Sequence, residues 1–321
     1  MKQIRVKMFW AALLCVWALG SSVHAAEKIR IAVTNYNITY LSGAVAAKKG
    51  FFRDDGFDPE IIVVKSNISI SALASGAVDY TMVFSAVVRA AIRGAPVKVV
   101  ATFIDSPTYV MLGQPGIKDV SELRKGSVAV GSYGSSGHLV AQLIAKHFGI
   151  DPETEIKIIA LGADGARLAA LKEGVVEGAL VAPPSDSEGK RMGFNVLVRA
   201  NEIVKFPYMG LGTTVKKIAE KPDEVKRVLK ALIRANQFMI KNREETIQIL
   251  SDWARTDKQS AGAAYDAIRK GFSKDGNIPD AGLRLVIEQA KNDTKITRDI
   301  GLSEVSDLKP VLQAQKELGL K

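Results

Sequence analysis

The stretch KIRIAVTNYNITYLSGAVAAKKGFFRDDGFDPEIIVV, residues 28–64, contains one strand–helix–strand unit. Residues 28–33 and 60–64 are rich in Ile and Val, which is typical of strands buried in a sheet. Between them a polar loop, 35–39, leads into residues 42–50, whose small and apolar side chains recur at helical spacing until Gly50. A unit of this kind predicts two parallel strands joined by a helix that covers their sheet.

The same alternation continues along the chain in two sets. The first set adds predicted strands at 80–84 and 97–103 and predicted helices at 68–76 and 85–93. The second set has predicted strands at 109–112, 127–132, 155–161, 178–182 and 195–198, and predicted helices at 138–148 and 163–173. Strands separated by helices of about ten residues favour βαβ units and parallel sheets in an α/β fold.

Breaks in this pattern predict the domain organisation. After about residue 215 the chain becomes helical, and Pro222 is expected in the first turn of a long helix. The two sets separate near 105–107, and the chain returns near 211–214. We therefore expect a first lobe of residues 26–105 and 212–321 and a second lobe of residues 106–211. Two crossings between lobes make a hinge, which suits a ligand held in a cleft.

Four motifs in order along the chain carry a resemblance to a known family. They are KGFF with GFDP (49–59), ALASGAVD (72–79), GAPVKVV (94–100) and AEKPDEVKRVLKA (219–231). These motifs resemble those of periplasmic solute-binding proteins of the nitrate/sulfonate/taurine type, in a superfamily that includes binders of a thiamine-precursor pyrimidine. The resemblance implies a type II periplasmic-binding-protein fold, with two α/β lobes around a ligand cleft and a C-terminal helical segment.

What the resemblance implies about function is capture of a small molecule between the lobes. The protein would then deliver it to an ABC permease in the inner membrane, which works with its ATPase. We expect a monomer. Some enzymes share the implied fold, but they act in the cytoplasm.

The pattern of residues 1–25 predicts a signal peptide rather than a part of the fold. Lys2, Arg5 and Lys7 precede an apolar run, 8–20, and small residues occupy the end, with Val23 and Ala25 at the −3 and −1 places. This arrangement predicts Sec-type export to the periplasm with cleavage after Ala25. An uncleaved anchor is the alternative, and a lipid on Cys15 is disfavoured by the bulky residues before it. Cys15 is the only cysteine, so the processed chain forms no disulfide.

The charge pattern argues against nucleic acid as a partner. The net charge of +10 falls to +7 on processing, because residues 1–25 contain three basic residues and no acidic ones. The other basic residues are scattered among acidic ones, as in KKIAEKPDEVKR (216–227), which is typical of a solvated surface. A mildly positive field still favours anionic small molecules.

Loops that follow strands are where open α/β sheets bind ligands, and four such loops supply candidate residues. Three of them are polar turns whose side chains would equally serve as ordinary helix caps or core residues. From these three loops we select as candidate ligand contacts Tyr36, Asn37, Thr39, Ser66, Asn67, Phe84 and Ser85.

The fourth loop, GSYGSSG (131–137), combines glycines and serines at the start of a helix. Backbone N–H groups and the helix dipole at such a point favour an oxygen-rich, anionic ligand group. The glycine spacing matches neither a dinucleotide motif nor a phosphate-binding P-loop, so no nucleotide cofactor is expected. A bare turn capped by its own serines is the alternative. Candidates from this region, with an aromatic wall residue further along, are Ser132, Tyr133, Ser135, Ser136, His138 and Tyr208.

No catalytic machinery is predicted. Nothing in the sequence supplies a base, a nucleophile and an oxyanion site together, and the histidines lack a nearby cluster of metal ligands. We therefore expect a binding protein without metal or cofactor, for a sulfonate or carboxylate. A neutral heteroaromatic such as a thiamine-precursor pyrimidine stays open, because no arginine lies in the four loops. A periplasmic sensing subunit is the further alternative, and neighbouring genes would distinguish it.

Overall fold

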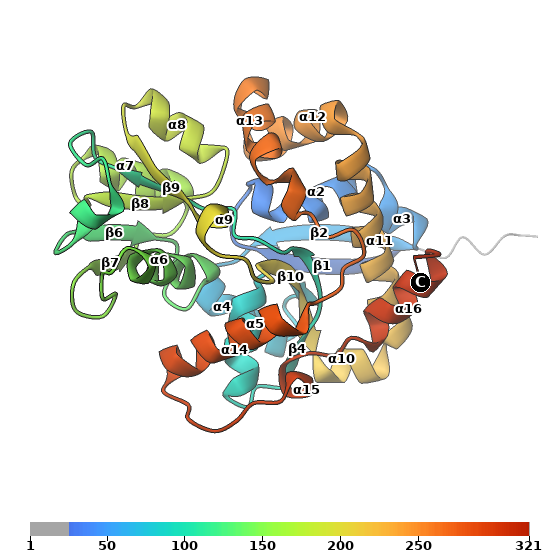
Figure 1. Cartoon of the computed structure of the whole chain (residues 1–321). Coiled ribbons are helices and arrows are strands. Elements are labelled where there is room, and N and C mark those ends of the chain that lie inside the picture. The colour runs from blue at the N-terminus through green and yellow to red at the C-terminus, as the bar shows by residue number, and fades with distance from the viewer. Residues whose placement is uncertain (1–25, 321) are drawn as a thin grey trace, which may run out of the picture.

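Two five-stranded sheets form the framework of the molecule. The computed structural model describes residues 26–320, and Figure 1 shows the two sheets side by side, each flanked by helices. The first sheet has the order β2-β1-β3-β10-β4 and the second the order β7-β6-β8-β5-β9. The strands are β1 (Glu27–Val33), β2 (Phe57–Val63), β3 (Tyr80–Thr81), β4 (Val97–Ile104), β5 (Val110–Gly113), β6 (Ser127–Val130), β7 (Lys157–Ala160), β8 (Gly178–Val181), β9 (Asn195–Arg199) and β10 (Met209–Thr214).

Both sheets are mixed, so the prediction of parallel sheets is only partly right. β1 pairs in parallel with β2 and β3, and β6 pairs in parallel with β7 and β8. However, β10 runs antiparallel to β3 and β4, and β5 runs antiparallel to β8 and β9. The reason is topological: β10 returns from the second sheet and inserts between two strands that were formed before the chain left.

β10 is a central strand where the sequence predicted only a crossing. Its two glycines replace the β-branched residues that are typical of a strand, and the packing requires glycine at both positions. A Cβ on Gly212 would lie 2.6 Å from Val87 Cγ2, and a Cβ on Gly210 would collide with the carbonyl of Ala101. These glycines let α5 and β4 approach the backbone of β10 closely. β2, by contrast, begins three residues earlier than predicted and tolerates Pro59 because it is an edge strand.

Helices cover the sheets in sequence order. The segments up to residue 147 are η2 (Ile38–Tyr40), α2 (Leu41–Lys48), α3 (Phe51–Asp54), α4 (Ser66–Ala74), α5 (Phe84–Ile92), η3 (Val120–Leu123) and α6 (Ser136–His147). The middle segments are α7 (Asp164–Lys172), α8 (Ser185–Arg191), α9 (Ala200–Ile203) and α10 (Val215–Glu220). The last are α11 (Pro222–Lys241), α12 (Arg243–Ala254), α13 (Lys258–Ile268), η4 (Arg269–Gly271), α14 (Asp280–Thr294), α15 (Leu302–Val305) and α16 (Lys309–Glu317).

The long helix α11 fixes the C-terminal helical segment to the first sheet. Pro222 stands at its start, as predicted, and one face of the helix is fully buried. Asn236 interrupts that apolar face but is itself buried, and its amide donates to the Phe103 carbonyl at 2.7 Å. It also accepts from Ser42 Oγ at 2.6 Å, so it connects α11 to β4 and α2. The polar interruption is therefore satisfied and positions three elements.

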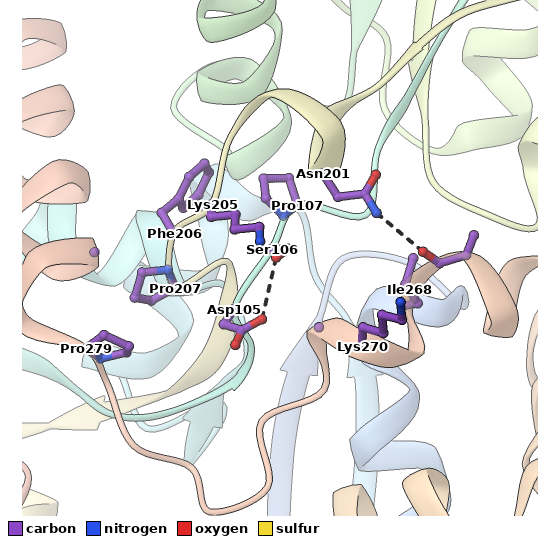
Figure 2. Close-up of a pocket in the computed structure, with 13 residues that line it drawn as sticks. Asp105, Ser106, Pro107, Asn201, Lys205, Phe206, Pro207, Ile268, Lys270 and Pro279 are labelled. Carbon is purple, nitrogen blue, oxygen red and sulfur yellow. Dashed lines mark hydrogen bonds between the residues drawn. The ribbon is translucent and has the colours of Figure 1, made fainter.

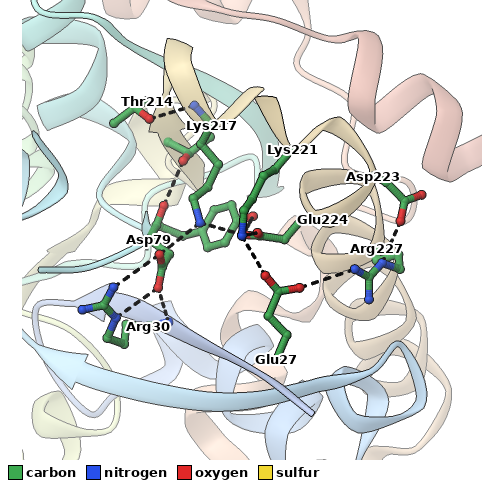
Figure 3. A network of polar contacts seen from close by, with 11 residues as sticks. Glu27, Arg30, Asp79, Thr214, Lys217, Lys221, Asp223, Glu224 and Arg227 are labelled. Carbon is green, nitrogen blue, oxygen red and sulfur yellow. Dashed lines mark hydrogen bonds and ion pairs between the residues drawn. The ribbon is translucent and has the colours of Figure 1, made fainter. Parts of the chain in front are cut away.

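A network of ion pairs closes the amino-terminal end of β1, and we call it the basal network (Figure 3). Lys217 Nζ lies 3.0 Å from Asp79 Oδ1 and 2.7 Å from Glu224 Oε1. Arg30 Nε lies 3.1 Å from Asp79 Oδ2, and the Tyr80 hydroxyl donates to Glu224 Oε1 at 2.8 Å. The remaining members are Glu27, Lys221 and Arg227. The network ties β1 to α10 and α11.

Two chain crossings join the sheets, between Ile104 and Val110 and between Arg199 and Met209. Within residues 26–320, no helix combines the length and the apolar character that crossing a membrane requires. The predicted signal peptide lies outside the described residues.

Candidate functional site

A cavity of about 310 Å³ lies where the carboxyl ends of strands from both sheets meet, and we call it the central cavity. Residues after β1, β2, β6 and β7 line it, joined by the last residue of β2, one residue before β5 and one inside α7. The lining residues are Thr34, Asn35, Asn37, Thr39, Tyr40, Val63, Lys65, Ser66, Tyr109, Gly131, Ser132, Ser135, Gly162, Ala163 and Arg167.

The loop after β1 reaches across the cavity to α7. Asn37 caps the short helix η2, because its Oδ1 accepts from the Thr39 N–H at 3.0 Å. The side-chain amides of Asn35 and Asn37 donate to Asp164 Oδ2 at 2.8 and 3.0 Å. Thr39 Oγ1 lies 2.7 Å from Thr108 Oγ1, beside the first crossing. This loop is therefore held at both ends, and it contacts an element that packs on the second sheet.

A buried ion pair lies behind this contact. Asp164 and Arg167, both 3% exposed, pair within the first turn of α7. Arg167 also donates to the Leu180 carbonyl, and the Ala182 N–H donates to Asp164 Oδ1 at 3.3 Å. Arg167 Nε is buried and has no hydrogen-bond partner within residues 26–320. The guanidinium thus has one unpaired donor, which is covered by protein.

Phenol and hydroxyl groups form the wall next to the crossings. The Tyr40 hydroxyl lies 2.8 Å from Thr34 Oγ1, and the Tyr109 ring packs edge-on against Tyr208 with centroids 5.6 Å apart. Burial raises the pKa of Tyr40, Tyr109 and Tyr208 above the ordinary value for tyrosine. These phenols therefore stay protonated at neutral pH and can donate hydrogen bonds.

Three helix N-termini meet at the central cavity. The N-cap residues of α4, α6 and α7 are Lys65, Ser135 and Ala163, and all three line it. Ser135 Oγ accepts from the His138 N–H at 3.2 Å and donates to the Ser132 carbonyl at 2.7 Å, which fixes the start of α6. Each N-terminus directs unpaired backbone N–H groups and the positive end of a dipole toward the same space.

The structure brings together five of the sequence-predicted residues at this cavity. They are Asn37, Thr39, Ser66, Ser132 and Ser135. Lys65, Tyr40, Tyr109 and Arg167 line it as well, and sequence reasoning missed them. A search of the loop after the strand at 155–161, which was not among the four loops, would have found α7 with Asp164 and Arg167.

Other predicted residues lie outside the lining because packing directs their side chains elsewhere. Phe84 is the first residue of α5 rather than the end of a strand, and it is buried in the core. Ser85 and Ser136 are buried and hydrogen-bond each other at 2.8 Å between α5 and α6. Tyr208 lies behind Tyr109, where it is 2% exposed.

The remaining predicted residues lie at the rim or beside it. Tyr36 is 45% exposed, and its ring packs edge-on against Trp253 at 4.6 Å between centroids. The Trp253 indole N–H donates to the Asn37 carbonyl at 3.0 Å. Asn67 and Tyr133 line an adjacent pocket. His138 accepts from the Gly134 N–H at 3.4 Å, and burial lowers its pKa, which favours the neutral imidazole.

A separate cavity of about 470 Å³ lies at the two crossings (Figure 2). Asp105 and Ser106 from the first crossing and Lys205 and Phe206 from the second border it, together with residues from α13 to α14. Burial raises the pKa of Asp105. This cavity shares no lining residue with the central cavity. Within residues 26–320, no three His, Cys, Asp or Glu side chains are grouped so as to hold a metal ion.

The chain is similar in sequence to proteins of two kinds. The family model described as NMT1/THI5 like matches residues 37–246. A 4-amino-5-hydroxymethyl-2-methylpyrimidine phosphate synthase of Candida albicans is 26% identical over 219 residues, which is 61% of this chain and 62% of the synthase. The match thus spans less than two thirds of that relative. A putative binding protein of Brucella abortus is 24% identical over 232 residues, 67% of this chain and 68% of the relative.

Solved structures confirm the predicted type II periplasmic-binding-protein fold. A protein of Bordetella bronchiseptica RB50 has a TM-score of 0.79 at 21% identity, over 91% of this chain and 98% of that one. The nitrate-binding protein NrtA of Synechocystis PCC 6803 has a TM-score of 0.75 at 14% identity, over 92% and 90%. The aliphatic sulphonate-binding protein SsuA of Escherichia coli has a TM-score of 0.69 at 18% identity, over 88% and 92%.

Proposed function

Because the chain belongs to the NMT1/THI5-like family and has the type II periplasmic-binding-protein fold, we propose that it is the solute-binding component of an ABC importer. In this proposal the periplasmic protein captures a small organic anion, a sulfonate or a carboxylate, in the central cavity. Its partners are an inner-membrane permease and its ATPase. The nitrate- and sulphonate-binding proteins of the same fold support this function class.

The observation that carries the proposal is the electrostatic character of the central cavity. Three helix N-termini meet there, and its lining includes Lys65 and Arg167 but no carboxylate. Each N-terminus favours a negative group by about 0.3–1 kcal/mol at an exposed site, and more when water is partly excluded. The nearby Asp164 is neutralised by Arg167 and accepts from two asparagine amides. An anionic group of the ligand would therefore meet donors on several sides.

The same lining supports binding rather than catalysis. The residues that form the central cavity include no histidine, cysteine or carboxylate. A synthase of the kind named among the relatives needs groups that move protons and form or break bonds. The lining hydroxyls and amides suit recognition, since they supply hydrogen bonds in fixed positions.

A neutral heteroaromatic such as a pyrimidine is the second candidate ligand. Tyr40 and Tyr109 line the cavity and offer aromatic surface, and the amides of Asn35 and Asn37 can pair with ring nitrogens. The Candida albicans relative, named for a pyrimidine phosphate product, is consistent with it. Ligand screening separates the two candidates, because only the anion requires the positive lining.

The test is binding of anions and pyrimidines to the processed chain, residues 26–321, by thermal shift and calorimetry. A ligand at 100 times its Kd should stabilise the fold by about 2.7 kcal/mol. For an anion, Lys65→Gln should weaken binding about tenfold, since hydrogen bonds to charged groups contribute about 1.5–3 kcal/mol. Lys118→Gln is the matched control, because Lys118 is exposed and far from the lining. Binding of pyrimidines alone, unaffected by Lys65→Gln, would contradict the anion proposal.

A further inference from the structure

A second pocket, of about 360 Å³, adjoins the central cavity. The two share Ser66, and they lie on either side of the loop that precedes α6: Ser132 and Ser135 face the central cavity, whereas Tyr133 and Gly134 face the second pocket. The two pockets are therefore immediate neighbours.

Two arginines line this second pocket, one of them paired with a carboxylate and the other without one. Arg89 Nη2 lies 2.6 Å from Asp293 Oδ2, and the side chains are 19% and 7% exposed. This pair holds the guanidinium in place and balances its charge, while Arg89 Nε is covered by the loop at Gly134, where an added Cβ would lie 3.1 Å from it. Arg93, one turn further along α5, is exposed and makes no ion pair in the described part of the chain. No carboxylate lines the pocket.

The polar and apolar parts of the pocket are arranged for a two-ended ligand. Asn67 stands near Ser66 at the start of α4, and Tyr133, 60% exposed, projects from the loop on the other side. Ile70 and three alanines contribute apolar surface to the same lining. A short carbon chain fits such surface, and a bidentate acid fits a guanidinium.

We infer that the ligand is an organic dianion whose two acidic groups occupy the two pockets. One group binds at the N-termini of α4, α6 and α7, and the second binds at Arg93, beside the Arg89–Asp293 ion pair. This inference rests on the proposed anion-binding function and makes it more specific. Sulfonates and carboxylates both supply an acidic group, and their α,ω-disubstituted members carry one such group at each end.

The test compares dianions with monoanions of equal length by calorimetry at constant ionic strength. The probes are alkane-α,ω-disulfonates and α,ω-dicarboxylates of increasing chain length, each against the monoacid with the same number of carbons. At one preferred length, the dianion should bind at least about tenfold more tightly, as expected for one added charge-assisted contact. Arg93→Gln should remove that preference and leave the affinity for the monoanion unchanged.

The control variant is Arg284→Gln, because Arg284 is an exposed arginine that lines neither pocket. It should retain the full preference for the dianion. Equal binding of dianions and monoanions overturns this inference and leaves the anion proposal standing, and so does a dianion preference that survives Arg93→Gln. Binding of neither series overturns the proposed function and the inference together.

Discussion

The basal network and the central cavity lie at opposite ends of β1, and both consist of polar side chains. In the basal network every charge has an opposite charge within 4.0 Å, as Lys217 does between Asp79 and Glu224. In the central cavity, by contrast, Lys65 and three helix N-termini face a lining that contains no carboxylate. The two ends therefore differ in charge balance: carboxylates and cations are paired where the fold is held together, whereas the lining of the central cavity has cations and helix N-termini but no carboxylate.

The largest expected effect is in the basal network. Lys217→Met leaves Asp79 and Glu224 without their shared cation, and Glu224 is only 4% exposed. We expect the free energy of unfolding to fall by about 2 kcal/mol, because Glu224 then keeps only Lys221 as a cation and Asp79 keeps only Arg30. Urea unfolding measures it. Ligand affinity should not change, since the network lies at the other end of β1.

Lys216→Met is the control for that experiment. Lys216 is exposed and pairs only with exposed Glu220 at 4.0 Å, so its loss should change stability by less than about 1 kcal/mol. Equal losses from the two variants would show that the basal network contributes no more than a surface ion pair.

Two helix caps, one near each end of β1, allow the two ends to be compared with matched substitutions whose effect on stability is smaller. Ser135 caps α6 at the central cavity, and Thr214 caps α10 beside the basal network, where it accepts from the Lys217 N–H at 3.0 Å. Either change to alanine should cost about 1 kcal/mol of stability. Only Ser135→Ala should also weaken anion binding, about fivefold by calorimetry. Weaker binding by Thr214→Ala as well would contradict the separation of the two ends.

The smallest expected effect is a difference in pH dependence. Burial lowers the pKa of His138, so the folded state favours the neutral ring. The stability that the neutral ring contributes is therefore full above the pKa of histidine in the unfolded chain, about 6.5, and is lost as the pH falls below that value. In the basal network, burial alone would raise the pKa of Asp79 and Glu224. Hydrogen bonds from Lys217 and its neighbours outweigh burial, so the pKa of both carboxyl groups is lowered. The two carboxylates therefore stabilise the fold above about pH 4, and this stabilisation is lost on further acidification.

Stability curves against pH therefore should show two separate losses. His138→Gln should remove the one that begins near neutrality and leave the acidic one. Chemical unfolding at a series of pH values measures both. A single loss below about pH 4 in the unmodified protein would show that His138 titrates normally in the fold.

Features that depend on neighbouring residues could be predicted from the sequence. Features that depend on contacts between distant residues could not. The strand–helix alternation and the loops containing Asn37, Ser132 and Ser135 are local patterns, so they are visible in the sequence. β10 was missed because Gly210 and Gly212 are required by α5 and β4, which lie more than 100 residues earlier. Arg167 was missed because it lies inside a helix, and only tertiary packing brings it to the cavity wall.

The contact between Trp253 and the first loop has a spectroscopic consequence. The sequence has three tryptophans, and the other two, Trp10 and Trp17, precede the predicted cleavage point. The processed chain would thus carry a single indole, hydrogen-bonded to the Asn37 carbonyl and packed on Tyr36. Any shift of this loop when solute enters would alter the polarity around that indole. The protein therefore contains its own fluorophore against a loop that lines the site, and its emission can follow capture and release in real time without a label.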